Sequence, residues 1–489
     1  MMSSDKFNIF SFSGKMKIMH LSWMAFFVSF MVWFNAAPLM GVIALSLGLT
    51  NEQIKTLLIL NVALTIPARI IIGMVTDKYG PRLTYSALLI LCSFPCFMFA
   101  LGETFEQLAL ARFLLGFIGA GFVIGIRMVS EWFPAKELGT AEGIYGGWGN
   151  FGSAAAAFTL PVIAIAFGGD NGWRYAIGLT GVMSFVFAFI YYFNVSDTPK
   201  GSTYFKPKKA GALEVTSKGD LALLVLMKLP MYATLALLGW KLSPAGVGMF
   251  TQMEVYGIYG ILVAVLMVDL YQTYQVNKHI FAGPVPEFER YPFKQVAVLN
   301  VLYFSTFGSE LAVVSMLPLY FAETFELGLT QAGMLASTYA FMNLVSRPGG
   351  GWISDRFGRK PTLMILTAGL ALGYLGMAQI TSDWALPLAV IMVMTCSFFV
   401  QGGEGAVFAA VPLIKRRLTG QIAGMTGAYG NVGAVFFLTV YSMVSTQIFF
   451  YVIAASAVLG LVSLLFLTEP KGHIAEVNED GEVTLISVN

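Results

Sequence analysis

The sequence predicts an all-α membrane protein built from two related bundles of six helices, with a helical hairpin inserted between them. Three observations lead to this fold class. Hydrophobic residues make up 57% of the 489 residues and charged residues only 11%, whereas a soluble domain carries about 25% charged residues. Apolar runs follow one another along the chain, and about 20 apolar helical residues suffice to cross a bilayer. Motifs of the first half also recur in the second.

The first bundle is predicted within residues 1–199 and the second within residues 294–470. The apolar runs of the first bundle lie near 20–47, 55–77, 83–101, 107–133, 141–168 and 174–194. Those of the second lie near 294–322, 330–354, 361–381, 384–411, 420–445 and 447–468. The first run is too long for the apolar core of a signal peptide, so we expect it to be the first span. Residues 471–489 contain acidic residues such as Glu476 and are expected to form a solvated, loosely ordered cytoplasmic tail.

Residues 200–293, between the two bundles, are longer than a plain linker needs to be. The basic stretch KPKKA is followed by apolar runs at 221–240 and 254–273. Two interpretations stay open: a hairpin of two membrane-spanning helices, or a pair of helices lying in the membrane interface. The length of the runs favours the hairpin, whereas Pro230 within the first run counts against a regular spanning helix.

Basic residues gather on alternate loops, and the loops between them hold mainly acidic residues. The basic segments lie at 6–17, 78–82, 136, 200–209, 356–360, 415–417 and 471, and the acidic residues include Glu103, Glu106, Asp170, Glu323, Glu326 and Asp383. Cytoplasmic loops of membrane proteins collect Lys and Arg. We therefore expect a multi-pass protein of the plasma membrane, which is the inner membrane in a bacterial cell, with both termini in the cytoplasm.

The two halves repeat each other at a constant offset. Arg69 stands eight residues before Asp77 in RIIIGMVTDKYGPR, and Arg347 stands eight residues before Asp355 in RPGGGWISDRFGRK, 278 residues further along. Beyond Pro134 and Pro412 the matched glycines follow at an offset of 281, as in GGWGNFG (146–152) and GAYGNVG (427–433). Transporters built from six-helix repeats bind their substrate between the halves at mid-depth. A central binding site is therefore predicted.

These motifs resemble those of known transporters. GMVTDKYGPR and GWISDRFGRK are similar to the GxxxDRxGRR signature of the major facilitator superfamily, and this implies gating or structural roles for Asp77, Arg82, Asp355 and Arg359. The two glycine rows resemble the paired signatures of the nitrate/nitrite porter family, in the branch of cyanobacterial and plant high-affinity nitrate permeases. The stretches at 303–318 and 400–417 share this resemblance, whereas the insertion at 200–293 departs from the commonest members. The resemblance implies a major facilitator fold and transport of nitrate and nitrite by alternating access.

Arg69 and Arg347 are the candidate anion-binding residues. Each lies about 12 Å of helix rise above its Asp, close to the bilayer midplane. An ionisable residue at that depth is costly and usually marks a site or pathway. A guanidinium offers a planar fork of donors, which suits planar nitrate better than a lysine does. The alternative is that each arginine pairs with a membrane carboxylate. In the porter family the arginines at these two positions contact the substrate.

The resemblance also implies which other residues surround the anion. The rings of Phe122, Tyr303 and Phe307 are expected to sandwich the anion, and Asn150 is expected to hydrogen-bond it. Asn431, the repeat mate of Asn150, is a second candidate ligand. Ordinary packing is the alternative for the rings. The glycines Gly146, Gly149 and Gly430 are expected to let the helices close on a small ion, which is itself a packing role.

Glu131, Glu310 and Glu404 are the candidate proton-coupling residues, because all three fall within apolar runs and a buried carboxyl group can carry a proton. The alternative is a salt bridge. This alternative suits Glu131, because Arg127 lies one turn earlier, and it suits Glu310 and Glu404 if they lie beside the substrate arginines.

Uptake of an anion needs a driving reaction, because an inside-negative membrane opposes its entry by about 2.3 kcal/mol per charge per 100 mV. Symport with more than one proton, or exchange of nitrate for internal nitrite, would supply it, and the resemblance favours symport. A carrier of another small organic anion and a nitrate sensor that does not transport remain alternatives. The sequence shows no catalytic or metal-binding motif and no nucleotide-binding loop. We expect no enzyme activity, no cofactor and no nucleic-acid partner, only nitrate, nitrite, protons and the lipid bilayer, and a monomer.

Overall fold

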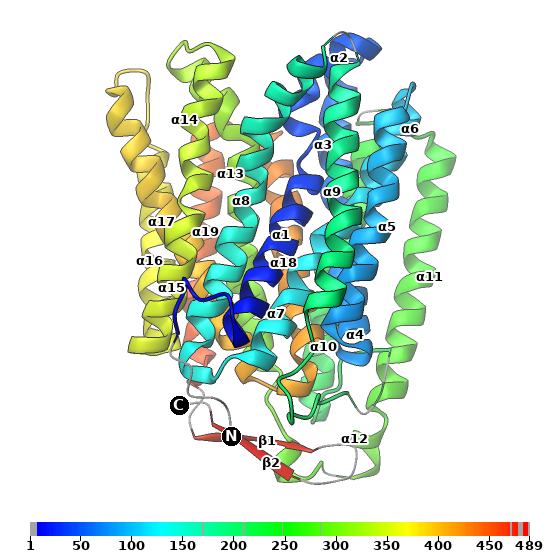
Figure 1. The fold of residues 1–489 in the computed structure, drawn as a ribbon, viewed down its shortest axis with the longest axis vertical. Coiled ribbons are helices and arrows are strands. Elements are labelled where there is room, and N and C mark those ends of the chain that lie inside the picture. Colours follow the sequence, from blue (N-terminus) through cyan, green and yellow to red (C-terminus); the bar gives the residue numbers. More distant parts are fainter. Residues whose placement is uncertain are drawn as a thin grey trace.

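The computed structural model describes residues 7–168, 171–207, 209, 211–246, 248–283, 285–469, 472–477 and 483–487. Long helices run side by side along one axis (Figure 1). Within the described residues, twelve helical stretches are long and apolar enough to cross a membrane. Helices α14 (Leu329–Phe341), α15 (Asn343–Phe357) and α16 (Arg359–Met377) run among them in the bundle without belonging to those twelve. The predicted arrangement of packed, membrane-spanning helices is therefore present.

The first half forms a succession of helices that matches the predicted runs. Their bounds are α1 (Gly14–Trp33), η1 (Ala37–Leu39), α2 (Met40–Leu47), α3 (Asn51–Ala63), α4 (Thr65–Tyr79), α5 (Pro81–Leu101), α6 (Phe105–Leu115), η2 (Gly116–Ala120), α7 (Gly121–Trp132), α8 (Ala135–Phe167) and α9 (Gly172–Asn194), where η marks a short 3-10 helix.

The inserted segment and the second half continue in the same way. Their elements are α10 (Lys218–Leu242), α11 (Gln252–Asn277), α12 (His279–Ala282), η3 (Glu287–Glu289), α13 (Lys294–Thr324), α14 (Leu329–Phe341), α15 (Asn343–Phe357), α16 (Arg359–Met377), α17 (Leu386–Ala410), η4 (Val411–Leu413), η5 (Arg416–Leu418), α18 (Thr419–Tyr441), α19 (Thr446–Ser463), η6 (Leu464–Phe466), β1 (His473–Val477) and β2 (Val483–Ser487).

The repeat between the halves extends to a break in the second helix of each. Leu64 separates α3 from α4, and Met342 separates α14 from α15 at the same offset of 278 residues. Arg69 and Arg347 each follow the break by five residues. Helix α8 packs against α15, and α18 packs against α4. These two helix pairs join the halves and place each arginine at the contact between them.

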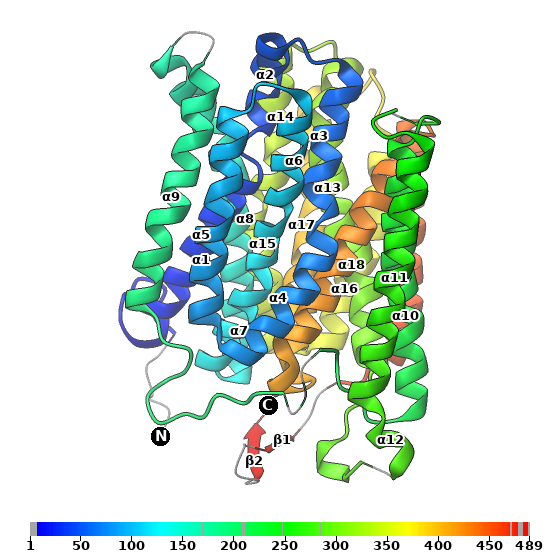
Figure 2. The same cartoon turned by 90° about the vertical axis from the view of Figure 1, so that its right-hand side faces the viewer.

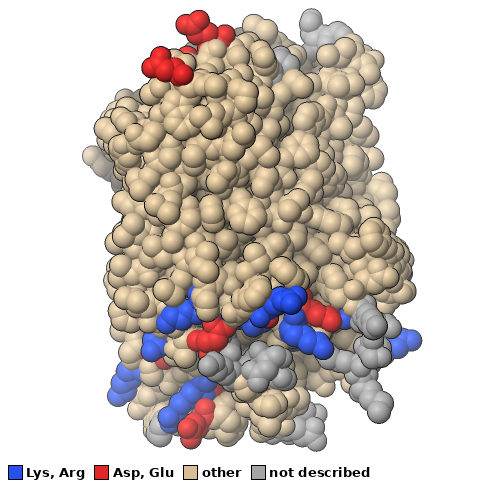
Figure 3. Space-filling model, turned by 90° about the vertical axis from the view of Figure 1, so that its left-hand side faces the viewer, with Lys and Arg blue, Asp and Glu red and all other residues tan. Residues whose placement is uncertain are grey.

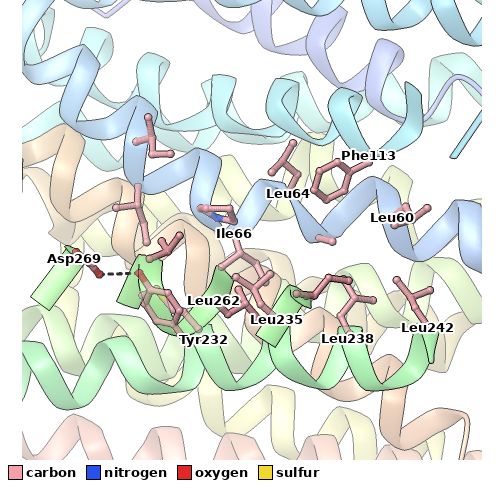
Figure 4. Close-up of a pocket in the computed structure, with 18 of the residues that line it drawn as sticks. Leu60, Leu64, Ile66, Phe113, Tyr232, Leu235, Leu238, Leu242, Leu262 and Asp269 are labelled. Carbon is pink, nitrogen blue, oxygen red and sulfur yellow. Dashed lines mark hydrogen bonds between the residues drawn. The ribbon is translucent and has the colours of Figure 1, made fainter. Parts of the chain in front are cut away.

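Helices α10 and α11 stand upright, parallel to the other long helices (Figure 2), with α10 packed against both α18 and α11. An ion pair joins them, with Lys228 Nζ 2.5 Å from Asp269 Oδ1, and Tyr232 Oη donates to Asp269 Oδ2 at 3.1 Å. Both helices are among the twelve stretches that are long and apolar enough to cross a membrane, and α10 continues through Pro230. A mainly apolar cavity of about 1170 Å³ separates the hairpin from α3 and α4 (Figure 4).

Both chain ends lie at the same end of the bundle (Figure 1). On the face drawn in Figure 3, Lys and Arg side chains gather at that lower end together with some acidic residues, whereas acidic side chains stand at the upper end. We call these two ends the basic end and the acidic end. Their separation matches the alternation of charge along the sequence.

The described residues of the C-terminal tail, 472–477 and 483–487, are not loosely ordered as predicted. Strands β1 and β2 pair antiparallel, with His473 opposite Ser487. Glu476 is fully buried and accepts a hydrogen bond from Arg417 N at 3.3 Å, and its Oε2 lies 3.7 Å from Lys415 Nζ. Burial lowers the pKa of the Lys415 ammonium, and Glu476 beside it acts in the opposite direction. The prediction was wrong because it treated Glu476 as a solvated charge, whereas the loop between α17 and α18 supplies its partners.

Candidate functional site

The glycine rows of α8 and α18 lie where the arginine of the opposite half passes. A Cβ added at Gly146 would stand 2.6 Å from Arg347 Nε, and one added at Gly427 would stand 3.0 Å from Arg69 Cδ. Only a residue without a side chain leaves room for the guanidinium at these positions. In each of these two contacts, one half of the protein supplies the arginine and the other half supplies the glycine backbone against which the arginine packs.

Further glycines of the two rows pack against aromatic rings. Gly430 faces Phe307 and Tyr303, with a Cβ there 2.7 Å and 2.8 Å from their Cδ1 atoms. Gly149 faces the ring of Phe26 in the same way. These glycines accordingly have the packing role that was expected, because they let the rings of Phe26, Tyr303 and Phe307 approach the backbone of α8 and α18 closely.

Phe122 on α7 lies between the two arginines. The Cζ atoms of Arg69 and Arg347 are 5.4 Å and 5.1 Å from its ring centroid. Tyr303 stacks on Phe122 at 6.3 Å between centroids and on Phe307 at 5.1 Å, with the planes within 7°. Arg69 Cζ also lies 4.9 Å from the Phe307 ring. All five residues are buried, so residues from four helices form one cluster of cations and π faces.

Arg69 is the unbalanced charge of this cluster. Its Nε donates to Gly119 O at 3.2 Å and its Nη1 to Gly427 O at 2.7 Å, while its Nη2 has no hydrogen-bond partner among the described residues. In the described part of the chain, no carboxylate lies within ion-pair distance of Arg69. A buried guanidinium with a free donor is an arrangement that an anion would complete.

Arg347 does have a carboxylate partner. Its Nη1 donates to Glu404 Oε2 at 2.5 Å, and its Nη2 donates to the Tyr303 hydroxyl at 3.0 Å. The alternative considered from the sequence, an arginine paired with a membrane carboxylate, therefore describes Arg347 but not Arg69. The Tyr303 ring also stacks on Phe122 and Phe307, the two rings that Arg69 faces, and so links the two cations.

Of the three candidate proton carriers, the structure brings two to this cluster. Glu310 accepts hydrogen bonds from Asn343 Nδ2 at 2.5 Å and Gln401 Nε2 at 3.3 Å, and its side chain interacts with that of Glu404. One oxygen of each carboxyl group lacks a hydrogen-bond partner within the described residues. Each carboxyl group can therefore take up a proton at its free oxygen.

Glu131 lies apart from the cluster, near the basic end of α7. Its carboxylate is 3.1 Å from Arg127 Nη2 and 3.6 Å from Arg416 Nη2. These contacts favour the salt-bridge alternative for Glu131.

The two asparagines lie on α8 and α18 and are both buried. Asn431 Nδ2 donates at 3.2 Å to Gly427 O, the same oxygen that Arg69 binds. The Oδ1 atoms of Asn150 and Asn431 lack partners among the residues described. Asn150 follows Gly146 by one helical turn, so it lies on the face of α8 that Arg347 contacts.

Asp77 and Asp355 fasten the two halves together at the basic end. Asp77 Oδ1 accepts a hydrogen bond from Gly420 N at 2.9 Å, and Oδ2 accepts one from the next residue at 2.8 Å. Asp355 binds Gly139 N and its neighbour in the same way, at 2.9 Å and 2.8 Å. Each carboxylate therefore holds backbone N–H groups near the beginning of a helix in the other half, in the first turn of α18 for Asp77 and from the fifth residue of α8 for Asp355.

The two arginines of the same motifs differ in their contacts. Arg359 Nη2 donates to Ala135 O at 2.9 Å, across the contact between the halves, and lies 3.5 Å from Asp355. Arg82 Nε instead donates to Tyr192 O at 2.7 Å, within its own half. Arg359 therefore contributes to the fastening, and Arg82 anchors α9.

Sequence reasoning did not single out Glu142, a buried acid on α8. Glu142 is 2% exposed. Neither oxygen of its carboxylate has a hydrogen-bond partner among the described residues. The repeat held a signal for this residue. Glu142 is the charged residue in the row GTAEGIYGGWGNFG, and the position that matches it in the second half, at an offset of 281, is Ala423.

The arrangement brings two buried guanidinium groups together with the stacked rings of Phe122, Tyr303 and Phe307. The described residues hold no cluster of three side chains that could bind a metal ion. The two guanidinium groups and the π faces can bind a small planar anion, and the carboxyl groups nearby can take up protons.

Comparisons with known proteins agree on one family. The sequence profile of the Major Facilitator Superfamily matches residues 22–276 and 299–487. The chain is 48% identical to the nitrate/nitrite transporter NrtP of Picosynechococcus sp., over 96% of each chain. It is 31% identical to the high affinity nitrate transporter 2.5 of Arabidopsis thaliana, over 88% of this chain and 74% of that one.

Two solved structures are similar in fold. A double tryptophan mutant of XylE matches with a TM-score of 0.63 at 15% identity, over 94% of this chain and 97% of that chain. The human organic anion transporter MFSD10 matches with a TM-score of 0.61 at 11% identity, over 92% and 100%. These likenesses show the fold alone, and they confirm the fold class predicted from the sequence.

Proposed function

The chain belongs to the Major Facilitator Superfamily and, within it, to the family of its nitrate/nitrite transporter relatives, and from this premise we propose that it carries nitrate and nitrite across the plasma membrane by alternating access, driven by protons. It is a transporter and not an enzyme. The observation that carries the proposal is the free donor of Arg69, held beside Arg347 in a cluster of stacked rings. A planar monoanion between these groups would satisfy that donor and the unbalanced charge.

The size and shape of nitrate suit this centre. Its charge is spread over three oxygens in one plane, so a guanidinium can bind it edge to edge while an aromatic ring covers its face. Phe122, Tyr303 and Phe307 supply nearly parallel rings. Nitrite offers two oxygens in a similar plane, which supports the same site for both ions.

Charge balance supports coupling to protons. Arg69 and Arg347 bring two positive charges, and Glu404 and Glu310 bring two negative charges when both are ionised. A nitrate ion adds a negative charge to this buried cluster, and one proton on the Glu310 and Glu404 pair restores neutrality. Since linkage is reciprocal, a bound proton strengthens nitrate binding by the same factor as nitrate strengthens proton binding.

The contacts at the basic end support alternating access. Asp77 and Asp355 hold the halves together there through backbone N–H groups, and these contacts can break without unfolding a helix. We place the basic end in the cytoplasm, because Lys and Arg collect on that side of membrane proteins. One chain supplies every group of the site, which supports a monomer as the transporting unit.

Purified protein in proteoliposomes tests the proposal. We expect labelled nitrate to enter against an excess of unlabelled internal nitrate or nitrite, but not against internal lactate. An inward proton gradient alone should accelerate net uptake. Counterflow without any response to the proton gradient would favour the nitrate/nitrite exchange alternative. Nitrate binding without uptake would favour the sensor, and equal counterflow against lactate would favour a general organic anion carrier.

A further inference from the structure

Glu142 is a buried acid that the anion site does not use. It lies one turn from Gly146 toward the basic end, on the face of α8 that also carries Gly139 and packs against α15. Its residue is 2% exposed, and neither carboxylate oxygen has a hydrogen-bond partner in the described part of the chain.

The charged groups that face Glu142 are each bound to another partner. They are Arg347 and Asp355 on α15 and Arg416 on η5. Arg347 donates to Glu404, Asp355 binds a backbone N–H group of α8, and Arg416 lies 3.6 Å from Glu131. An ionised carboxylate buried without a donor is strongly unfavourable. Glu142 is therefore most stable with a proton bound while the halves are closed at the basic end.

The fold does not need a carboxyl group at this position. At an offset of 281 residues, α18 carries Ala423 in place of Glu142 and packs against α4 with the same glycine row. A methyl group there fills the equivalent position of the second half. The acid on α8 consequently has a role other than packing.

We propose that Glu142 binds the second of two protons that cross with each nitrate ion, the first being bound by Glu310 and Glu404. This assignment rests on the proposed function as a proton-coupled nitrate transporter. When the contacts of Asp355 with α8 open, water and the Arg416 guanidinium reach Glu142, and the proton leaves at the basic end. Two protons and one nitrate move one net positive charge, so an inside-negative potential drives uptake.

The test counts protons per nitrate in proteoliposomes with an internal pH dye and labelled nitrate, under potassium-valinomycin potentials. We expect two protons per nitrate in the unaltered protein and faster uptake with the interior negative. In Glu142→Gln we expect one proton per nitrate, uptake that no longer responds to the potential, and retained nitrate counterflow. Glu137→Gln is the matched control on the same helix, because Glu137 pairs with Lys15, and it should keep both protons.

The other outcomes separate the two proposals. Two protons per nitrate in Glu142→Gln would overturn the role of Glu142, and so would a single proton in the unaltered protein. An unaltered protein that moves no protons with nitrate would overturn the proposed function itself. Glu142→Asp keeps a carboxyl group and should restore the second proton. If both variants lose nitrate counterflow, Glu142 is a structural residue and the assignment fails.

Discussion

The geometry of Arg69 leads to the sharpest prediction, which concerns its replacement by lysine. Arg69 uses Nε and Nη1 to bind Gly119 O and Gly427 O at 3.2 Å and 2.7 Å, and only then has Nη2 left for an anion. A lysine has one nitrogen and cannot reach both carbonyl oxygens and the anion together. A charge-assisted hydrogen bond contributes about 1.5–3 kcal/mol. Arg69→Lys should therefore raise the Kd for nitrate between about tenfold and about 150-fold.

Nitrate affinity is measured from the concentration dependence of counterflow and from thermal stabilisation of the purified protein. The matched control is Arg112→Lys. Arg112 is also fully buried, but it donates to Trp33 O at 3.2 Å, outside the cluster, so its replacement should lower stability without changing affinity. If Arg69→Lys binds nitrate within about twofold of the unaltered protein, Arg69 is a tether between helices, and the anion site lies elsewhere.

Three further predictions test the surroundings of the site and the topology. Gly146→Ala should weaken nitrate binding at least about tenfold, because the new Cβ would stand 2.6 Å from Nε of Arg347. Gly257→Ala is the control: a Cβ at Gly257 meets no atom within 4 Å, so nitrate binding should not change. Asn150→Ala should lower nitrate affinity at an unchanged unfolding temperature, and unaltered affinity would remove this residue from the site. A cysteine replacing Ala245, in the exposed turn between α10 and α11, should react with an impermeant maleimide on intact cells, as should one replacing Asp383. Labelling of the second alone would mean that the hairpin does not span the membrane.

Sequence order was enough to locate the features that depend on the repeat. The matched spacings of Arg69 and Arg347 from Asp77 and Asp355 predict a shared depth in the bilayer, and the structure places both arginines against Phe122. Helical rise converts such spacings into positions, so no knowledge of the packing is required.

The contacts that were missed or left open join residues far apart in the chain. Arg347 and Glu404 are 57 residues apart, and no spacing rule links them, because their meeting depends on how α15 packs against α17. Glu476 and Lys415 are likewise far apart in the chain and form an ion pair in the fold. This contact holds strand β1 of the tail against the loop between α17 and α18. The lack of partners around Glu142 is also a property of packing. The repeat marks only that its mate is an alanine.

The paired contacts of Asp77 and Asp355 with backbone N–H groups have a consequence for regulation of the transport cycle. In the proposed alternating-access cycle they would set the ratio of inward-open to outward-open molecules, and they lie away from the proposed nitrate-binding groups. Weakening either contact would shift that ratio without altering the intrinsic affinity of the anion cluster. The apparent affinity for nitrate would then rise on one side of the membrane as it falls on the other, in proportion to the change in each population. The balance between import and export can thus be tuned by residues that never touch the ion.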